Sequence, residues 1–200
     1  MDTNSSSSPL YARLANHNNL RGGFVIAFLW GLAEATVFFL VPDIYLGFAG
    51  LFNWRKGLLA TAFVVAGSVL GGAIMYALAA HNAVEMNKFL TALPLINTDM
   101  VNSVKEQVQT NGVGALLTGP LQGIPYKVYA VQAGEQGIPL LSFLLATIPA
   151  RLERVLPVVL AGAITGVAFR KYIQHHTSLV LGAYVALWGC IYTLYYFRFR

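Results

Sequence analysis

Residues 57–80, GLLATAFVVAGSVLGGAIMYALAA, decide the fold class because they carry no charge over 24 positions. As an α-helix they would be ~36 Å long, enough to cross the ~30 Å hydrocarbon core of a bilayer with some tilt. Of the 200 residues in the chain, 56% are hydrophobic and 10% are charged, against about 25% charged in soluble domains. A soluble protein of this length could not bury so much apolar surface. Composition therefore excludes an ordinary soluble domain, a disordered chain and a disulfide-rich scaffold, and predicts an all-α integral membrane protein.

The positive charges of the chain are placed as membrane anchors. Lys and Arg number 13 against 8 Asp and Glu, which gives a net charge of +5. They stand singly or in pairs next to apolar runs, as at Arg55-Lys56 and Arg170-Lys171, whereas a nucleic-acid-binding protein gathers them in a patch or stripe. We therefore expect membrane lipids as partners and no nucleic acid. Cys190 is the only cysteine, so no intrachain disulfide can form and the redox compartment stays open.

Two other apolar segments are interrupted by polar residues and proline. Residues 24–53 contain Pro42, and residues 112–134 contain Pro120 and Pro125. Proline in mid-segment with polar neighbours favours a re-entrant hairpin, whose irregular backbone is tolerated only where protein or a watery cavity covers it. A segment that crosses the membrane is the alternative, because the positive charges on the two sides divide six against four in either arrangement.

The two interrupted segments look like repeats of one unit. Gly50 and Gly134 each end an Ala-Gly pair, and they lie 84 residues apart. Each segment precedes an apolar run long enough to span a membrane, residues 57–80 and residues 139–164. Duplicated units with broken helices are typical of transporters, in which the broken segments meet near the membrane midplane. The sequence therefore predicts two hairpins related as an inverted repeat, although two proline-containing apolar segments could also match by chance.

The chain divides into a polar tail, residues 1–21, and one membrane domain, residues 22–200, whose parts are hairpin 24–53, span 57–80, peripheral amphipathic region 84–110, hairpin 112–134, span 139–164 and span 178–197. The apolar run after Arg21 also imitates a signal peptide. The amphipathic prediction rests on Val101, Val104 and Val108, which share one helical face, and a packed loop is the alternative. The last span ends in aromatic residues followed by Arg198, which is an aromatic belt with a basic anchor.

Five ionisable residues lie in or beside the apolar segments: Glu34, Asp43, Lys127, Arg151 and Arg154. An Asp, Lys or Arg at the centre of a membrane helix costs ~2.5–3.5 kcal/mol on insertion, so these groups must pair, line water or lose their charge. Arg151 and Arg154 share one helical face and need anions from elsewhere. In one interpretation, Glu34 and Asp43 pair with the arginines and only fix the hairpins. In the other, the cluster lines a hydrated cavity that binds a phosphate-bearing ligand and exchanges protons.

The sequence lacks the motifs of a metal-dependent or intramembrane enzyme. His81 and Glu85 do not complete the His-Glu-xx-His zinc signature, and the pair His175-His176 lies in a polar stretch. The chain has no Walker loop, no Gly-x-Ser-x-Gly elbow and no His/Cys zinc set. We therefore expect no catalytic residue, no metal and no cofactor, and a protein that is not an enzyme. Tyr126 and the tyrosines near the carboxyl terminus are expected to be interface anchors.

Two short motifs surround the prolines of the two interrupted segments. They are residues 33–43, AEATVFFLVPD, and residues 119–127, GPLQGIPYK, and the second is followed by a Gly-xxx-aliphatic-xxxx-aromatic pattern at Gly134, Ile138 and Phe143. These stretches resemble the first and second hairpins of the DedA family, also called SNARE-associated Golgi or VTT-domain proteins. The proline–aromatic–lysine form is most similar to the small YqaA-like branch. The resemblance covers roughly residues 22–166.

The resemblance implies roles for individual residues. Glu34 and Asp43 match the acidic pair of the family's first hairpin and would serve transport and proton coupling. Lys127 matches the basic residue after the proline of the second hairpin, and Arg151, or else Arg154, matches a basic residue further along; these three would hold a phosphate head group. The residues that would shape the hairpin tips are Pro42, Pro120, Pro125 and Gly134.

The resemblance also implies a function. Two facing re-entrant hairpins, each followed by a transmembrane helix, would move phospholipids or polyprenyl-phosphate carriers between leaflets, with a link to protons or Na+. The protein would be a multi-pass component of the cell membrane, the inner membrane in a bacterium, as a monomer or a homodimer. The chain departs from the family at Gly123, where the pattern has Phe or Tyr, and at Pro42-Asp43, where it has Pro-Gly-Glu. The substrate of other members therefore does not transfer.

Two functions of other kinds remain alternatives to lipid transport. The same carboxylates could serve a proton- or cation-coupled exporter of a small solute, and lipids would then not compete for the site. A membrane assembly or structural factor without transport is the other alternative. In that case, substitution of Glu34 or Arg151 would lower the abundance of the protein and leave no specific activity to lose.

Overall fold

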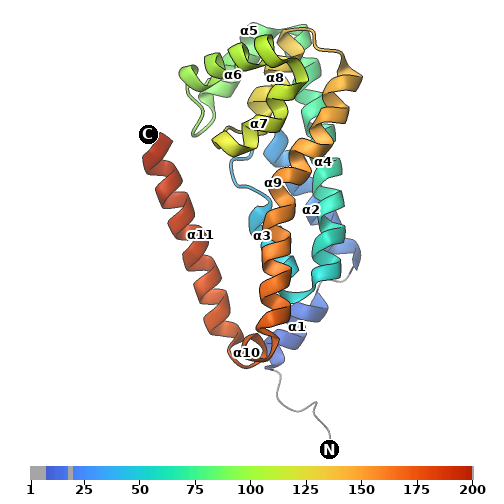
Figure 1. The fold of residues 1–200 in the computed structure, drawn as a ribbon, viewed down its shortest axis with the longest axis vertical. Coiled ribbons are helices and arrows are strands. Elements are labelled where there is room, and N and C mark those ends of the chain that lie inside the picture. Colours follow the sequence, from blue (N-terminus) through green and yellow to red (C-terminus); the bar gives the residue numbers. More distant parts are fainter. Residues whose placement is uncertain (1–7, 18–19, 200) are drawn as a thin grey trace, which may run out of the picture.

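The computed structural model describes residues 8–17 and 20–199, and in these two ranges the chain is helical and contains no strand. The elements are, in chain order, α1 (Pro9–His17), α2 (Leu20–Thr36), α3 (Asp43–Phe52), α4 (Trp54–His81), α5 (Ala83–Ala92), α6 (Thr98–Asn111), the short 3-10 helix η1 (Gly112–Gly114), α7 (Ala115–Gln122), α8 (Tyr126–Glu135), α9 (Leu140–Ala168), α10 (Arg170–His175) and α11 (Thr177–Phe199). The long helices α4, α9 and α11 run along the length of the molecule, while α5 to α8 gather at one end (Figure 1). The all-α prediction is confirmed for the described ranges.

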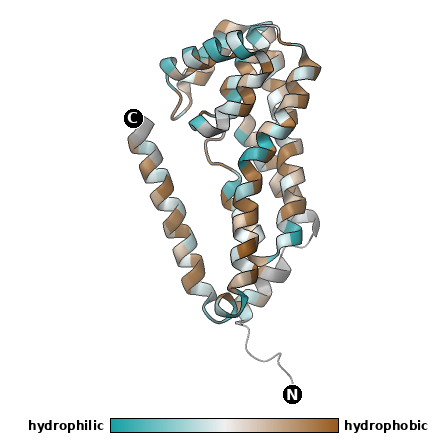
Figure 2. Ribbon diagram, in the orientation of Figure 1, coloured by the Kyte–Doolittle hydropathy of each residue, from teal (hydrophilic) through white to brown (hydrophobic). Residues whose placement is uncertain are grey.

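Two helices in the described part of the chain are long and apolar enough to cross a membrane. They are α4, which contains the uncharged residues 57–80, and the Thr177–Leu194 part of α11. The sequence also predicts a span over residues 139–164. α9 occupies that stretch and is 29 residues long, but a hydrophilic band crosses it in mid-length (Figure 2). Length and composition therefore single out two spans, and α9 differs from them by the charges at its centre.

The tightest helix contact in the fold joins α2 to α4. A methyl group on Gly67 of α4 would collide with the carbonyl oxygen of Phe28, and one on Gly71 would meet Ala35. Glycines four residues apart let two backbones approach closely, which gains van der Waals contact that larger side chains would prevent. The Gly67-xxx-Gly71 pair therefore fixes α2, the first arm of the first interrupted segment, against the helix that contains the uncharged residues 57–80.

A hydrophobic core lies at the end of the molecule where α5 to α8 gather. Nine consecutive residues of α8, from Tyr126 to Gly134, are buried, because α4 covers one side of this helix and α6 another. Val101, Val104 and Val108 of α6 are buried in the same core. The predicted amphipathic helix therefore exists, but its apolar face packs against protein, whereas the sequence predicts that it lies on the membrane surface.

Helices close the opposite end of the molecule as well. Pro9–His17, within the stretch predicted as a polar tail, forms α1, and the hydroxyl groups of Ser8 and Thr177 lie 2.8 Å apart and are hydrogen-bonded. Tyr11 of α1 packs against Phe52 at the end of α3. From this end α11 runs back at an angle to the bundle, and most of its length stands apart from the other helices (Figure 1).

Candidate functional site

The two breaks in the interrupted segments lie close together, beside the middle of α9. The first break is the linker between α2 and α3, residues 37–42, and the second is the linker between α7 and α8, residues 123–125. Both breaks line one cavity. The charged residues predicted from the sequence surround this meeting point.

Local interactions end α2 at Thr36 and begin α3 after Pro42. The hydroxyl of Thr36 donates to the carbonyl of Leu32 (2.9 Å), and the indole N–H of Trp30 donates to the carbonyl of Leu40 (3.0 Å). Pro42 is buried and directly precedes α3, where a residue without a backbone N–H costs nothing. The side chains of α2 thus satisfy part of the backbone that the break releases from the helix.

The second break depends on Gly123 and Pro125. Gly123 has φ +74°, in the left-handed region that favours glycine. Pro125 directly precedes α8. The other two predicted tip residues lie elsewhere: Pro120 is within α7, with its side chain outside the described part of the chain, and Gly134 lies in the last turn of α8, against α4.

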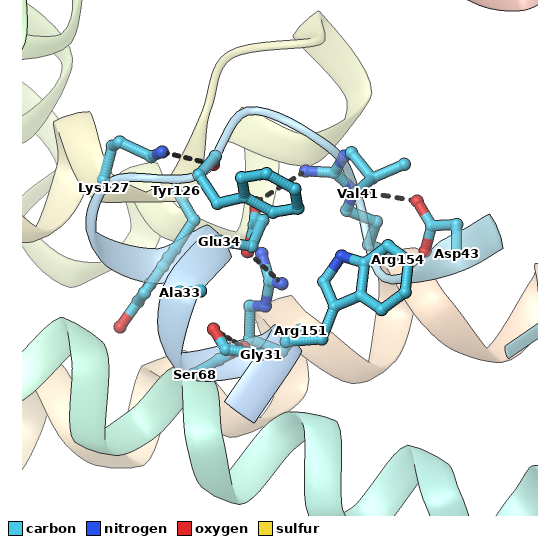
Figure 3. A network of polar contacts seen from close by, with 12 residues as sticks. Gly31, Ala33, Glu34, Val41, Asp43, Ser68, Tyr126, Lys127, Arg151 and Arg154 are labelled. Carbon is cyan, nitrogen blue, oxygen red and sulfur yellow. Dashed lines mark hydrogen bonds and ion pairs between the residues drawn. The ribbon is translucent and has the colours of Figure 1, made fainter. Parts of the chain in front are cut away.

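Ion pairs join α2 and α3 to α9 (Figure 3). Arg151 Nη2 lies 2.6 Å from Glu34 Oε2, and Arg154 Nη1 lies 3.8 Å from the other oxygen of Glu34. Arg154 Nε lies 3.5 Å from Asp43 Oδ2. The Arg151 and Glu34 side chains are 2% and 4% exposed, so water contributes little to their solvation. The predicted pairing of two arginines on one face with two acids is therefore found.

Lys127 connects the two breaks directly. Its ammonium group donates to the carbonyl of Phe38, at 2.7 Å, in the linker between α2 and α3. Lys127 is the second residue of α8 and is 3% exposed. A backbone carbonyl in the first break therefore accepts a charge-assisted hydrogen bond from α8.

Arg151 lies behind the other cations, within the protein. Its guanidinium carbon sits 5.2 Å from the centre of the Tyr126 ring, and the hydroxyl of Tyr126 is hydrogen-bonded to Thr147 at 2.9 Å. Carboxylate on one side and an aromatic face on the other compensate the buried charge. Arg151 therefore holds Glu34 in place and does not line the cavity between the breaks.

A cavity of about 310 Å³ opens between the two breaks. This is the lower end of the size range of ligand pockets. The residues at its polar end are Glu34, Asp43, Lys127 and Arg154, and the rest of the wall is mostly apolar. Asp43 Oδ1 is buried and has no hydrogen-bond partner among the described residues. The cavity thus combines an apolar interior with two cations and two acids at one end.

α11 completes the site, which the sequence did not indicate. The backbone N–H of Val41 donates to the hydroxyl of Tyr192 (2.8 Å), and the hydroxyl of Tyr184 donates to the carbonyl of Ile44 (2.7 Å). Trp188, midway between the two tyrosines, lines the cavity. Tyrosines near the carboxyl terminus are predicted as interface anchors, but Tyr192 binds the first break and Tyr184 binds the start of α3. The spacing of 184, 188 and 192, one helical face, is the signal that could have found them.

The remaining polar residues considered from the sequence lie outside the site. Glu153 is exposed on α9, and His81, His175 and His176 are exposed. Within residues 8–17 and 20–199, no three His, Cys, Asp or Glu side chains are grouped so that they could hold a metal ion.

Comparison with known proteins gave no match to a family model, to a curated protein or to a solved structure. The resemblance of residues 33–43 and 119–127 to the hairpins of the DedA family stays a prediction from the sequence. What the chain does is therefore argued from the geometry of its polar cluster and cavity.

Proposed function

We propose that this chain is a multi-pass membrane protein that moves phosphate-bearing lipids between the two leaflets, as the resemblance to the DedA family implies. The observation that carries the proposal is the buried cluster of two acids and three cations at the meeting point of two helix breaks, beside a largely apolar cavity. Ionisable groups inside a membrane domain mark pathways for ions or polar substrates. The cavity joins such groups to an apolar interior, and a lipid has both parts.

The lengths of the short helices support two re-entrant hairpins. α3 and α8 have 10 residues each and α7 has 8, so each is ~12–15 Å long. None of them can cross a ~30 Å hydrocarbon core alone. With α2 and α3 on either side of one break, and α7 and α8 on either side of the other, each pair would enter the membrane and return. The breaks would then lie at depth, covered by α9 and α11.

Packing supports the inverted repeat. The second arm of each hairpin packs against the long helix of the other unit, α3 against α9 and α8 against α4. A methyl group on Gly50 would collide with the carbonyl oxygen of Val159 in α9, and one on Gly134 with the carbonyl oxygen of Tyr76 in α4. These two glycines are the residues that the offset of 84 relates. If each unit packs its second arm against the long helix of the other unit, both breaks would lie at the centre of the membrane domain.

The cluster suggests how a phosphate would be held and released. Arg154 and Lys127 line the cavity, and both present donors suited to phosphate oxygens. Glu34 and Asp43 would neutralise the cations when no ligand is bound, and they would give way when a phosphate arrives. Arg151, behind them, would keep Glu34 in position throughout. Proton or Na+ coupling would act on the two carboxylates, which are the only acids lining the cavity in the described part of the chain.

Lipid movement in reconstituted vesicles tests the proposal. The full chain is placed in vesicles of phosphatidylcholine and phosphatidylglycerol that contain fluorescent phosphatidylglycerol, and an impermeant quencher reports exchange between leaflets. We expect faster exchange than in empty vesicles, and at least ~10-fold slower exchange with Arg154→Gln, because a charge-assisted hydrogen bond contributes ~1.5–3 kcal/mol. Lys88→Gln, an exposed cation far from the cluster, is the control.

The other outcomes separate the alternatives. Exchange no faster than in empty vesicles, over several phosphate lipids, would refute lipid movement. Loss of protein abundance with Arg154→Gln, without any specific loss of exchange per molecule, would favour a structural or assembly factor. Uptake of a soluble solute that lipids do not inhibit would favour a small-solute exporter.

A further inference from the structure

We propose that α11 and the turn at residues 94–96 form a subsite for a hydrocarbon chain, so that the cavity holds a phosphodiester lipid by its head and by one of its chains. The inference rests on the proposed function and adds a part of the site that lies outside the two hairpins. Trp188 and Ile191 come from α11, and Leu95 comes from the turn between α5 and α6.

The wall of the cavity carries side chains of two different chemistries, charged and apolar. Every ionisable side chain that lines it in the described ranges, except Tyr192, belongs to the cluster at the breaks. The turn at residues 94–96 supplies proline, leucine and isoleucine, and α11 supplies Trp188 and Ile191. A soluble phosphate compound would leave this apolar wall facing water, whereas a chain of CH₂ groups gains free energy from each group it buries there. One ligand with a charged head and an apolar chain fits a wall that carries both kinds of side chain.

The backbone of the turn is strained where it meets the cavity. Leu95 has φ +66°, and it is the only non-glycine residue with positive φ in the described part of the chain. A leucine in the left-handed region is costly, and such residues cluster at binding sites, where the strain is offset by function. Glycine would adopt this conformation freely but would remove the apolar side chain from the cavity wall. A leucine at this position is therefore best explained by a contact that the side chain makes.

Charge at the polar end selects the kind of phosphate. The formal charges of Glu34, Asp43, Lys127, Arg151 and Arg154 add up to +1. A phosphodiester head carries one negative charge and would neutralise the cluster. A phosphate monoester carries about −1.5 to −2 at pH 7 and would leave a buried excess of negative charge. The cluster therefore fits a diester phospholipid better than a polyprenyl monophosphate.

Quenching of tryptophan fluorescence locates the chain. Purified full-length protein in detergent is titrated with phosphatidylmethanol, a diester, whose acyl chains carry bromine. We expect a saturable quenching component, because bromine in the subsite lies next to Trp188. This component should disappear in Trp188→Phe and persist in Trp54→Phe, which removes an exposed tryptophan at the start of α4. Equal quenching in wild-type protein and Trp188→Phe would overturn the chain subsite.

Affinities measured in the same titration test the wall and the head group. Leu95→Gly should weaken phosphatidylmethanol binding by about 10-fold, since a buried leucine contributes about 1.5–3 kcal/mol, and Leu194→Ala, on the exposed side of α11, should leave it unchanged. Glycerophosphoglycerol, a diester that has no chain, should bind at least ~100-fold more weakly. Equal binding of glycerophosphoglycerol would overturn the chain subsite, and tighter binding of phosphatidic acid or polyprenyl phosphate, both monoesters, would overturn the diester assignment.

The vesicle assay separates this inference from the proposed function. Lipid exchange without any quenching that depends on Trp188 would refute the subsite and leave lipid movement standing. Quenching that depends on Trp188, together with no exchange in vesicles, would support the subsite and refute movement between leaflets.

Discussion

Two ion-pair clusters in this molecule have almost the same geometry but different surroundings. In the cluster at the breaks, Arg151 lies 2.6 Å from Glu34, and both side chains are at most 4% exposed. In the cluster at the end of the molecule, Lys105 lies 2.7 Å from Glu135, and the side chains are 43% and 17% exposed. The distance between the charges is therefore no guide to what each pair contributes. Access of solvent decides how much each pair contributes to stability, because a charge that loses its partner in the first cluster has no water to replace that partner.

The partners of the two acids differ as well. Glu135 also accepts a hydrogen bond from the amide of Asn87 at 2.7 Å and one from Gln132 at 3.2 Å. Glu34 instead lies between two arginines. Neutral donors and water help Lys105 to stabilise the carboxylate of Glu135, whereas the carboxylate of Glu34 is stabilised mainly by the charges of the two arginines. We expect the first arrangement to tolerate substitution and the second to be sensitive to it.

Arg151→Ala should have the largest effect of any single substitution in either cluster. It removes the partner of a buried carboxylate, and breaking a buried pair in this way costs about 3–5 kcal/mol. Thermal or denaturant unfolding of the purified protein in detergent measures the loss. Lys105→Ala, its counterpart in the exposed cluster, should cost at most about 1 kcal/mol. Similar losses in the two variants would contradict the role assigned to solvent.

Replacing both members of the buried pair separates stability from function. Glu34→Gln combined with Arg151→Met removes both charges, and a buried pair exchanged for neutral groups is often close to neutral in stability. We therefore expect the double variant to recover most of the stability lost in Arg151→Ala while lipid exchange stays at the level of empty vesicles. Unfolding and vesicle exchange measured on the same preparation test this. Full exchange by the double variant would mean that the pair only holds the fold together.

Tyr192→Phe should have an intermediate effect. It leaves the backbone N–H of Val41 without its hydrogen-bond acceptor, and an unsatisfied donor away from water costs about 1–3 kcal/mol. The unfolding midpoint in detergent should fall accordingly, and the first break should become more accessible to hydrogen exchange. Tyr172→Phe, at an exposed tyrosine of α10, is the control and should change neither quantity. An unchanged midpoint in Tyr192→Phe would show that α11 is not needed to hold the break.

Acid should produce the smallest effect, at the exposed cluster. Burial raises the pKa of Glu135, but hydrogen bonds from Lys105 and Asn87 and the charge of Lys105 outweigh it and hold this pKa below the ordinary value. Glu135 therefore stabilises the fold fully above the ordinary Glu pKa of about 4.3, and this contribution is lost as the pH falls through the lower pKa of the folded state. Lys105→Met should reduce that acid-dependent loss, measured as the unfolding midpoint at pH 3 to 6. An identical pH profile in wild type and variant would contradict the assignment.

The sequence correctly predicted an all-helical chain, and it placed prolines at two helix starts, because both depend on local properties. It did not predict α1, which lies in the stretch expected to be a polar tail. An uncharged run of 24 residues gives α4, and Pro42 and Pro125 stand where α3 and α8 begin. It also predicted that Arg151 and Arg154 share a face and need anions, for which Glu34, Asp43 and an anionic ligand were the candidates, since charges in apolar segments need partners. Helical periodicity and the cost of an unpaired charge can be judged from the sequence without knowledge of the tertiary contacts.

The sequence could not assign the charges to positions around the cavity. It grouped Arg151 with Lys127 and Arg154 as phosphate ligands, but Arg151 lies behind Glu34 and Tyr126 and does not line the cavity. It placed the apolar face of α6 at a membrane surface, whereas α8 covers that face. In both cases the surroundings of the residues depend on which distant segment packs against them. Local sequence patterns do not identify that segment.

By itself, then, the sequence determined an all-helical chain with apolar spans, two breaks and five charged side chains that need partners. Each of these features follows from residues within a few turns of one another. Tertiary structure alone decided that the breaks meet, that Lys127 bonds to the carbonyl of Phe38, and that α11 supplies Tyr192 and Trp188 to the site. Those contacts join residues up to 151 positions apart. They depend on the packing of whole helices, in which close approach of backbones and satisfaction of buried polar groups are settled together.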